Sequence, residues 1–320
     1  MSVISDHLAQ LRLGRAQTCG RMSLYPLLKP AGSQPTDHGL SARAFEAGTF
    51  HVGEVSDTGV VSELKAANDG DQPVLLLDGE ELQGAKQNRI LNVSVLVDSH
   101  TRVTLPVSCV EQGRWHYRSP GFAPAAQVLF SKARSRKAAY MAERRRAARG
   151  VEAAASFQAN QMAIWDDVEE SVSLADGATD TGAMSASYEA ERARLEAFEQ
   201  AFRAEPDQVG AVFCIDDHPA AVELLETPDL FAEAFPRLLR GHGLSTLQQG
   251  QTDGLGPAMT AADFVTRVAE SHVVAAPSVG LGEDLSLDSP ACSGSALCLP
   301  GRLIHLAAFS KPLFSAPAPH

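Results

Sequence analysis

The chain has 320 residues, and its 39 acidic side chains outnumber its 27 basic ones, which gives a net charge of −12. With 44% hydrophobic and 21% charged residues, its composition is that of a globular protein and excludes wholesale disorder and fibrous repeats. General binding to duplex DNA is disfavoured, because neutralising phosphates requires clustered cations. We expect a single domain over residues 1–320, with a frayed tail at 315–320.

Cysteine and histidine spacing narrows the class of protein further. No apolar run approaches the roughly 20 residues of a membrane span, and the N-terminal residues lack the features of a secretory signal. The five cysteines are odd in number and contain no C-x-x-C pair, which argues against a disulfide framework. The ten histidines show no metal-ligand spacing. We expect a cytoplasmic protein with buried thiols and no metal site, and its cofactors are unknown.

The first third of the chain predicts strands. Alternating or continuous apolar patterns run through residues 16–28, 49–55, 73–77, 90–97 and 102–110. The connections between these segments are too short to cross over between parallel neighbours. We therefore expect antiparallel pairing.

The middle of the chain, residues 125–204, predicts a helical section. Residues 125–149 are predicted to form a basic helix that ends at Gly150. The segment contains eight Lys or Arg residues and one acid, Glu143. Two more helices are expected at 156–172 and 186–204. The basic helix could contact RNA, dock a partner protein, pair with neighbouring acidic helices or stay solvated. Nucleic acid is not expected as a partner.

The last third predicts a mixture of strands and helices. Strands are expected at 209–215, 273–276, 296–299 and 303–309. Helices are expected at 220–226, at 228–240, where Gly241 and Gly243 should end the helix, and at 260–271. The whole pattern favours an α+β fold, with mainly antiparallel sheet elements from the N- and C-terminal thirds and a helical middle section.

The densest polar cluster lies at residues 78–89, between two apolar strands. Glu80 and Glu81 are candidates for proton transfer. The second half of the cluster could hold an anionic or amide-bearing ligand, since a guanidinium is a planar fork suited to phosphate or carboxylate. Alternatively, the run is a polar hairpin whose charges are solvated or pair with one another. Its candidate ligand-binding residues are Gln87, Asn88 and Arg89.

A second cluster, at residues 106–115, combines a thiol, a carboxylate, a guanidinium and an indole at the end of a strand. A carboxylate and a guanidinium beside an aromatic ring often line a pocket rim. Cys109 is expected to be a buried thiol, and His305, on an apolar strand, is expected to be satisfied by a backbone carbonyl. The candidates here and on the following helix are Glu111, Arg114, Trp115 and Gln161.

Residues 74–96 and 106–115 resemble the signature of one bacterial family. The family is named for its association with ADP-ribosylglycohydrolases and with rhodanese and phosphatase-superfamily proteins. Further matches at 161–165, 235–240 and 303–309 extend the resemblance over about residues 40–310. The resemblance implies membership of a family but no mechanism, and it assigns no catalytic residue. The proteins for which the family is named imply a link to nucleotide or ADP-ribose metabolism.

Two functional hypotheses follow. In the first, the protein binds, and can process, a small anionic ligand such as a nucleotide or an ADP-ribose derivative. Its candidate side chains should then converge in one cleft. In the second, the protein is a non-catalytic module that docks a partner through the basic helix. The sequence leaves the reaction and the oligomeric state open. The catalytic candidates are Glu80, Glu81 and Glu111, and the ligand-binding candidates are Gln87, Asn88, Arg89, Arg114, Trp115 and Gln161.

Overall fold

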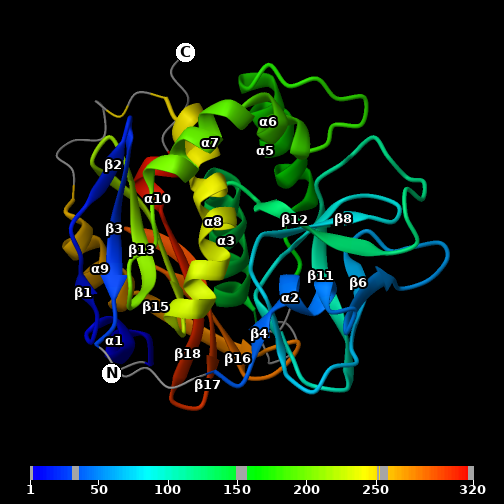
Figure 1. The fold of residues 1–320 in the computed structure, drawn as a ribbon, viewed down its shortest axis with the longest axis horizontal. Helices are drawn as coiled ribbons and strands as arrows, with labels where there is room; N and C mark the ends of the chain where they lie inside the picture. Colours follow the sequence, from blue (N-terminus) through cyan, green and yellow to red (C-terminus); the bar gives the residue numbers. More distant parts are fainter. Residues whose placement is uncertain (1–2, 31–35, 149–156, 251, 253–258, 316–320) are drawn as a thin grey trace.

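The computed structural model describes residues 3–30, 36–148, 157–250, 252 and 259–315. Within these ranges, three sheets and the helices around them form an α+β fold (Figure 1). The strands are β1 (Arg12–Leu13), β2 (Gln17–Cys19), β3 (Met22–Leu28), β4 (Gly39–Leu40), β5 (Phe50–Glu54), β6 (Glu63–Asn68), β7 (Val74–Leu76), β8 (Glu80–Gly84), β9 (Arg89–Leu91), β10 (Val95–Val97), β11 (Thr101–Cys109), β12 (Phe122–Val128), β13 (Gln208–Ile215), β14 (His218–Leu225), β15 (His272–Pro277), β16 (Glu283–Asp288), β17 (Cys292–Leu299) and β18 (Arg302–Ser310). The helices are α1 (Val3–Leu8), α2 (Ser41–Glu46), α3 (Ser131–Ala147), α5 (Gln161–Leu174), α6 (Ser185–Ala190), α7 (Arg192–Ala201), α8 (Pro228–Gln248), α9 (Ala261–Ala269) and α10 (Lys311–Ser315).

The largest sheet is antiparallel and joins both ends of the chain, as the sequence predicts. Its order is β1-β3-β13-β14-β18-β17-β16-β15, and β2 pairs with β3. Side chains alternate between its faces. Phe213 packs with α8 in one core, whereas Val212 packs with α1 and α9 in another. Helices α3 and α8 therefore stand between this sheet and the rest of the molecule (Figure 1).

The prediction of a helix at 220–226 is wrong, because this segment is the central strand β14. It pairs with both β13 and β18. A two-residue turn joins it to β13, in which Asp216 has φ 47° and Asp217 has φ 63°, the left-handed pair that twists two strands into a hairpin. A strand buried on both faces shows no polar alternation, so periodicity cannot separate it from a short buried helix.

Two smaller sheets come from the first half of the chain. One has the order β10-β7-β4, and the other has the order β12-β8-β9-β11-β6-β5. Strands β4 and β7 are parallel, and the other strand pairs of these two sheets are antiparallel, as expected of a mainly antiparallel fold. Residues 125–128 belong to β12, where Val128 pairs with Glu80, so the basic helix begins only at Ser131. It ends at Ala147, and Gly150 lies outside the described residues, as do residues 316–320 of the tail.

Helix α8 is longer than predicted, because Gly241 and Gly243 continue it to Gln248. A Cβ atom on Gly241 would lie 2.7 Å from Val128, and one on Gly243 would lie 2.9 Å from Phe198. Both glycines thus permit close packing of the helix rather than ending it. The helix predicted at 186–204 is two helices, α6 and α7, and that at 156–172 is α5.

Candidate functional site

The polar run at residues 78–89 is a buried hairpin. Strands β8 and β9 pair through Glu81 with Ile90 and Leu82 with Arg89. The most exposed charged side chain of the run is Lys86, at 8%. Solvation therefore does not account for these charges, and removing them from water is costly unless partners surround them.

Glu81 lies at the centre of the buried face of this hairpin. Its carboxylate accepts hydrogen bonds from Asn88 Nδ2 at 3.2 Å and from Gln127 Nε2 at 2.7 Å. Burial raises the pKa of Glu81 to about 7, and the hydrogen bonds from Gln127, Gln83 and Asn88 lower it only in part. Glu81 can therefore gain or lose a proton near neutral pH.

Asn88 joins Glu81 to a buried ion pair. Glu111 and Arg114 lie 2.6 Å apart, at 2% and 3% side-chain exposure. Asn88 Oδ1 accepts from Arg114 Nη2 at 3.0 Å, and the Asn88 backbone N–H donates to Glu111 at 3.1 Å. Burial alone would raise the pKa of Glu111, but hydrogen bonds from Arg114 and Thr181 bring it below its ordinary value. We call Glu81, Asn88, Glu111 and Arg114 the hairpin network.

A cavity of about 870 Å³ lies against the hairpin network. Five segments form its walls: β8, residues 111–118, β12, residues 176–190 and α8. Glu81 lies behind the wall and reaches it through its hydrogen bonds to Gln83 and Gln127. The lining side chains that concern the argument are Gln83, Glu111, Arg114, Gln127, Tyr188 and Arg240.

Glu80 lies apart from this network. Successive residues of a strand point to opposite faces, so Glu80 and Glu81 point in opposite directions from β8. The carboxylate of Glu80 accepts hydrogen bonds from Ser41 Oγ and from the Leu77 backbone N–H, and it lies 3.3 Å from Arg237. The sequence identified both carboxylates but not their separation.

Gln87 and Arg89 form a branch of the hairpin network that leads away from the cavity. Gln87 donates to the backbone carbonyl of Glu111 at 3.1 Å and accepts from Arg89 Nη1 at 2.9 Å. The Arg89 guanidinium lies 5.6 Å from the ring centre of Trp115. Neither Arg89 nor Trp115 is among the described residues that line the cavity.

Gln161 does not line the cavity; it holds the backbone of Cys109 in place. Its amide accepts from the backbone N–H of Cys109 and donates to the carbonyl of the same residue, both at 2.8 Å. It thereby ties α5 to the end of β11. Cys109 is buried, as expected, and burial raises the pKa of its thiol. The functional roles of all these candidates stay predictions.

A second buried polar cluster was missed by sequence reasoning. It joins the large sheet to the hairpin, and we call it the sealed cluster: Asp78, Arg134, Lys137, Glu223, His242 and His305. Arg134 bonds both Glu223 and Asp78, and Lys137 pairs with Asp78. His242 Nε2 lies 3.2 Å from Glu223. Burial alone would raise the pKa of Glu223, but Arg134 and His242 hold it well below its ordinary value.

Hydroxyl groups complete the sealed cluster. Ser131 Oγ lies 2.6 Å from His242 Nδ1, and Ser94 Oγ lies 2.8 Å from His305 Nδ1. The partner of His305 is thus a side chain, which corrects the expectation of a backbone carbonyl. The usable signal in the sequence was a single acid, Glu223, inside the apolar run 220–225. Such an acid needs a buried cation, and the basic helix supplies it.

The described residues bear on metal binding and on membrane spanning. Within the described ranges, no group of His, Cys, Asp and Glu side chains is placed to hold a metal ion. Among the same residues, no helix combines the length and apolar composition needed to cross a bilayer.

Comparison with known proteins places the chain in a family. The model of the ARPP-1 domain, the ARG and Rhodanese-Phosphatase-superfamily-associated Protein domain, matches residues 10–309. The chain belongs to the ARPP-1 family. The match begins ahead of residue 40, where the resemblance in the sequence started, and it includes both the hairpin network and the sealed cluster. No curated protein and no solved structure matches the chain.

Proposed function

We propose that this ARPP-1 chain binds a small anionic ligand, of the nucleotide or ADP-ribose class, in the cavity beside the hairpin network. The observation that carries the proposal is that Glu111 and Arg114 line a polar cavity, while Asn88 links them to Glu81 behind its wall. At about 870 Å³, the cavity has the size of pockets that hold small molecules.

Unused hydrogen-bond donors support an anionic ligand. Arg114 and Arg240 both line the cavity, and the Nε atom of each is buried without a partner among the described residues. Arg118 adds a third guanidinium to the wall. Buried donors are normally satisfied, and phosphate and carboxylate groups accept hydrogen bonds from guanidinium N–H groups. At Arg114 only Nε is unused, because both Nη atoms already donate to Asn88 and to backbone carbonyls.

The wall formed by residues 176–190 suits a sugar. Residues 176–190 contribute three carboxylates to the cavity, those of Asp176, Asp180 and Glu189. Carboxylates accept hydrogen bonds from hydroxyl groups but repel phosphates. A ligand that carries both an anionic group and hydroxyl groups fits these two walls better than a simple anion does.

Glu81 gives the site its pH dependence. It contacts the cavity wall through Gln83 and Gln127, so its charge affects how their amide groups are oriented. With its pKa raised to about 7, Glu81 changes charge within the physiological range. We propose that it sets the polarity of this wall and is the proton-exchanging group if the ligand is also processed.

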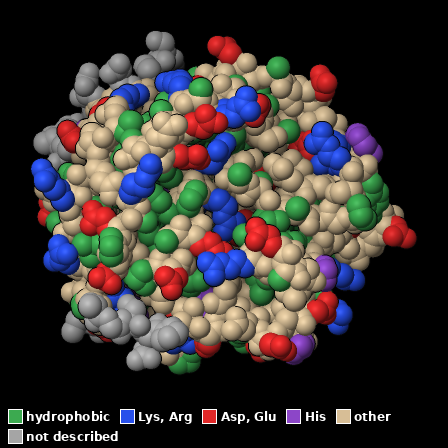
Figure 2. Space-filling view, in the orientation of Figure 1, with side chains coloured by type: hydrophobic (Ala, Val, Ile, Leu, Met, Phe, Trp, Pro, Cys, Tyr) green, Lys and Arg blue, Asp and Glu red, His purple; other side chains and the backbone are tan. Residues whose placement is uncertain are grey.

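The alternative hypothesis, docking of a partner through the basic helix, receives less support. Six cations of α3 already contact a carboxylate, and Arg144 stacks on Tyr140. Figure 2 shows cationic and anionic side chains interspersed on the face that it displays. Arg149 lies outside the described residues. The six cations are Lys132, Arg134, Arg136, Lys137, Arg145 and Arg146.

A thermal-shift screen tests the proposal. Nucleotides and ADP-ribose are added to the protein, because a ligand that binds the native state raises the midpoint of unfolding by mass action. We expect Arg240→Gln to weaken this stabilisation and Arg267→Gln, on the exposed surface of α9, to leave it unchanged. The proposal fails if no anion of this class shifts the midpoint, or if both variants respond like the unmodified chain.

A further inference from the structure

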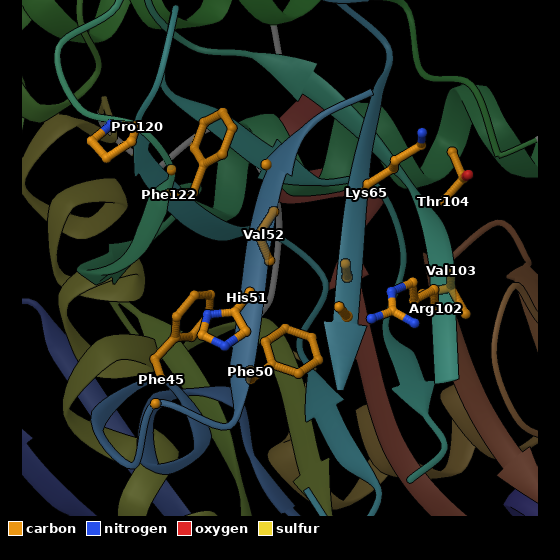
Figure 3. Close-up of a pocket in the computed structure, with 15 residues that line it drawn as sticks. Phe45, Phe50, His51, Val52, Lys65, Arg102, Val103, Thr104, Pro120 and Phe122 are labelled. Carbon is orange, nitrogen blue, oxygen red and sulfur yellow. The ribbon is translucent and has the colours of Figure 1, made fainter. Parts of the chain in front are cut away.

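A second hollow lies on the outer face of β5, β6 and β11, away from the hairpin network. It has a volume of about 700 Å³ (Figure 3). Val52 and Ala66 pair across β5 and β6 and point inward to the core. Their neighbours Gly53 and Ala67 therefore occupy the outward positions. Because both residues are small, the sheet surface is depressed between taller side chains.

Aromatic and aliphatic groups form one side of the hollow. Phe45 comes from α2, Phe122 is the first residue of β12, and Pro120 lies in the loop before it. In Figure 3 these rings gather around β5 together with His51 and Phe50. Phe45 and Phe50 pack edge to face, with their ring centres 5.3 Å apart. This side can take up the flat, apolar part of a ligand.

The other side of the hollow is cationic. Lys65 on β6 and Arg102 on β11 stand there beside Thr104 (Figure 3). The described lining contains no Asp or Glu, although acids outnumber bases in the whole chain by 39 to 27. Asp69, just outside, lies 3.6 Å from Arg102 and 3.9 Å from His51.

Lys65 is left without a counter-ion. Among the described residues it has neither an ion pair nor a hydrogen bond from its side chain. We propose that this hollow is a second binding site, which takes a small anion with a planar apolar group, the anionic group lying at Lys65 and the planar group between Phe45 and Phe122. The size of the hollow is that of small-molecule sites, and its charge is opposite to that of the ligand.

Ligand-observed NMR with two matched probes tests this inference. Naphthoate carries the planar group and the charge, whereas naphthalene methanol carries the planar group alone. We expect saturable binding of naphthoate, weakened roughly tenfold by Lys65→Gln, because a charge-assisted contact is lost. The same substitution should leave binding of the neutral probe unchanged. Arg12→Gln, an exposed cation on β1 of the other sheet, is the matched control.

A second variant fills the hollow without removing charge. Ala67→Leu places a larger side chain on the outer face of β6 and should abolish binding of both probes. Ala275→Leu makes the same change at an exposed position on β15 and should have no effect. Ligand stabilisation at the cavity beside the hairpin network should survive Ala67→Leu, so the two proposals fail separately.

Four outcomes would overturn the inference. If naphthoate binds no better than the neutral probe, or if Lys65→Gln and Arg12→Gln have equal effects, the cation has no role. Concentration-dependent dimerisation that Ala67→Leu abolishes would assign the hollow to a second copy of this chain. Failure of naphthoate to saturate would remove the site altogether.

Discussion

The sealed cluster and the hairpin network are built from similar side chains but differ in what surrounds them. In the sealed cluster, Arg134 pairs with Asp78 and Glu223, and Lys137 pairs with Asp78. His242 contacts Glu223, and His305 bonds Ser94. In the hairpin network, the wall residue Arg114 keeps a buried Nε without a partner and borders a cavity. Burial of charge alone therefore does not point to a ligand site, and the site proposed above depends on the cavity that Arg114 borders.

Helix α8 joins the two regions. Arg240 lines the cavity, and His242, two residues later, belongs to the sealed cluster. Gly241 lies between them and packs against β12. The rigid cluster thus holds the helix that carries one wall of the cavity, which is how a buried ion-pair network can support a site without touching its ligand.

The largest effect is expected from opening the sealed cluster. Glu223→Ala leaves Arg134 buried without its main partner, and loss of one member of a buried pair costs about 3–5 kcal/mol. We expect the free energy of unfolding, measured with denaturant at neutral pH, to fall by this amount. Glu270→Ala, which removes an exposed acid directly after α9, is the control and should change it little. A small loss with Glu223→Ala would contradict the distinction between the regions.

A smaller, pH-dependent effect is expected in the hairpin network. The pKa of Glu81 is about 7 in the native state against 4.5 for an unperturbed glutamate, so the native state binds more protons between these values. Stability should then fall as the pH rises from 4.5 to 7. Glu81→Gln does not titrate, so its stability relative to the unmodified chain should rise by about 3 kcal/mol between acid and mildly alkaline pH.

Unfolding curves at a series of pH values measure this difference. Glu283→Gln, at an exposed position on β16, should show no such trend. A constant difference between Glu81→Gln and the unmodified chain across the series would mean that the pKa of Glu81 is not raised, and Glu81 would then lose its proposed role.

The smallest effect is expected at the connection between the regions. Gly241→Ala gains helix propensity, but its Cβ would lie 2.7 Å from Val128, so we expect a net loss of about 1 kcal/mol. Val128→Ala makes room for it, and the double variant should lose less stability than the sum of the two single variants. Additive losses in this double-mutant cycle would show that the close contact has no energetic role.

Much of the fold followed from local patterns. The short connections in the first third favoured antiparallel pairing, and the large sheet is antiparallel. The β14 strand was missed because burial on both faces removes the alternation on which prediction depends. Gly241 was misread because a glycine that permits close packing and one that ends a helix look alike in sequence.

The candidate site was predictable only in part. The polar run and the motif at 106–115 identified the side chains that meet in the hairpin network, because these residues are not needed for apolar packing. Residues 176–190 and Arg240 also line the cavity. They are brought there by contacts between segments distant in sequence, which local sequence patterns do not predict. Which carboxylate of the pair Glu80 and Glu81 faces the network depends on strand register, a property of the folded sheet.

A crystal structure of the chain grown with ADP-ribose is the most direct test of the central claim. The account predicts ligand density in the cavity beside the hairpin network, with an anionic group in hydrogen-bond contact with Arg114 or Arg240 and hydroxyl groups facing residues 176–190. Density in the hollow on β5, β6 and β11 with the cavity holding only solvent, or no ligand at saturating concentration, would contradict it.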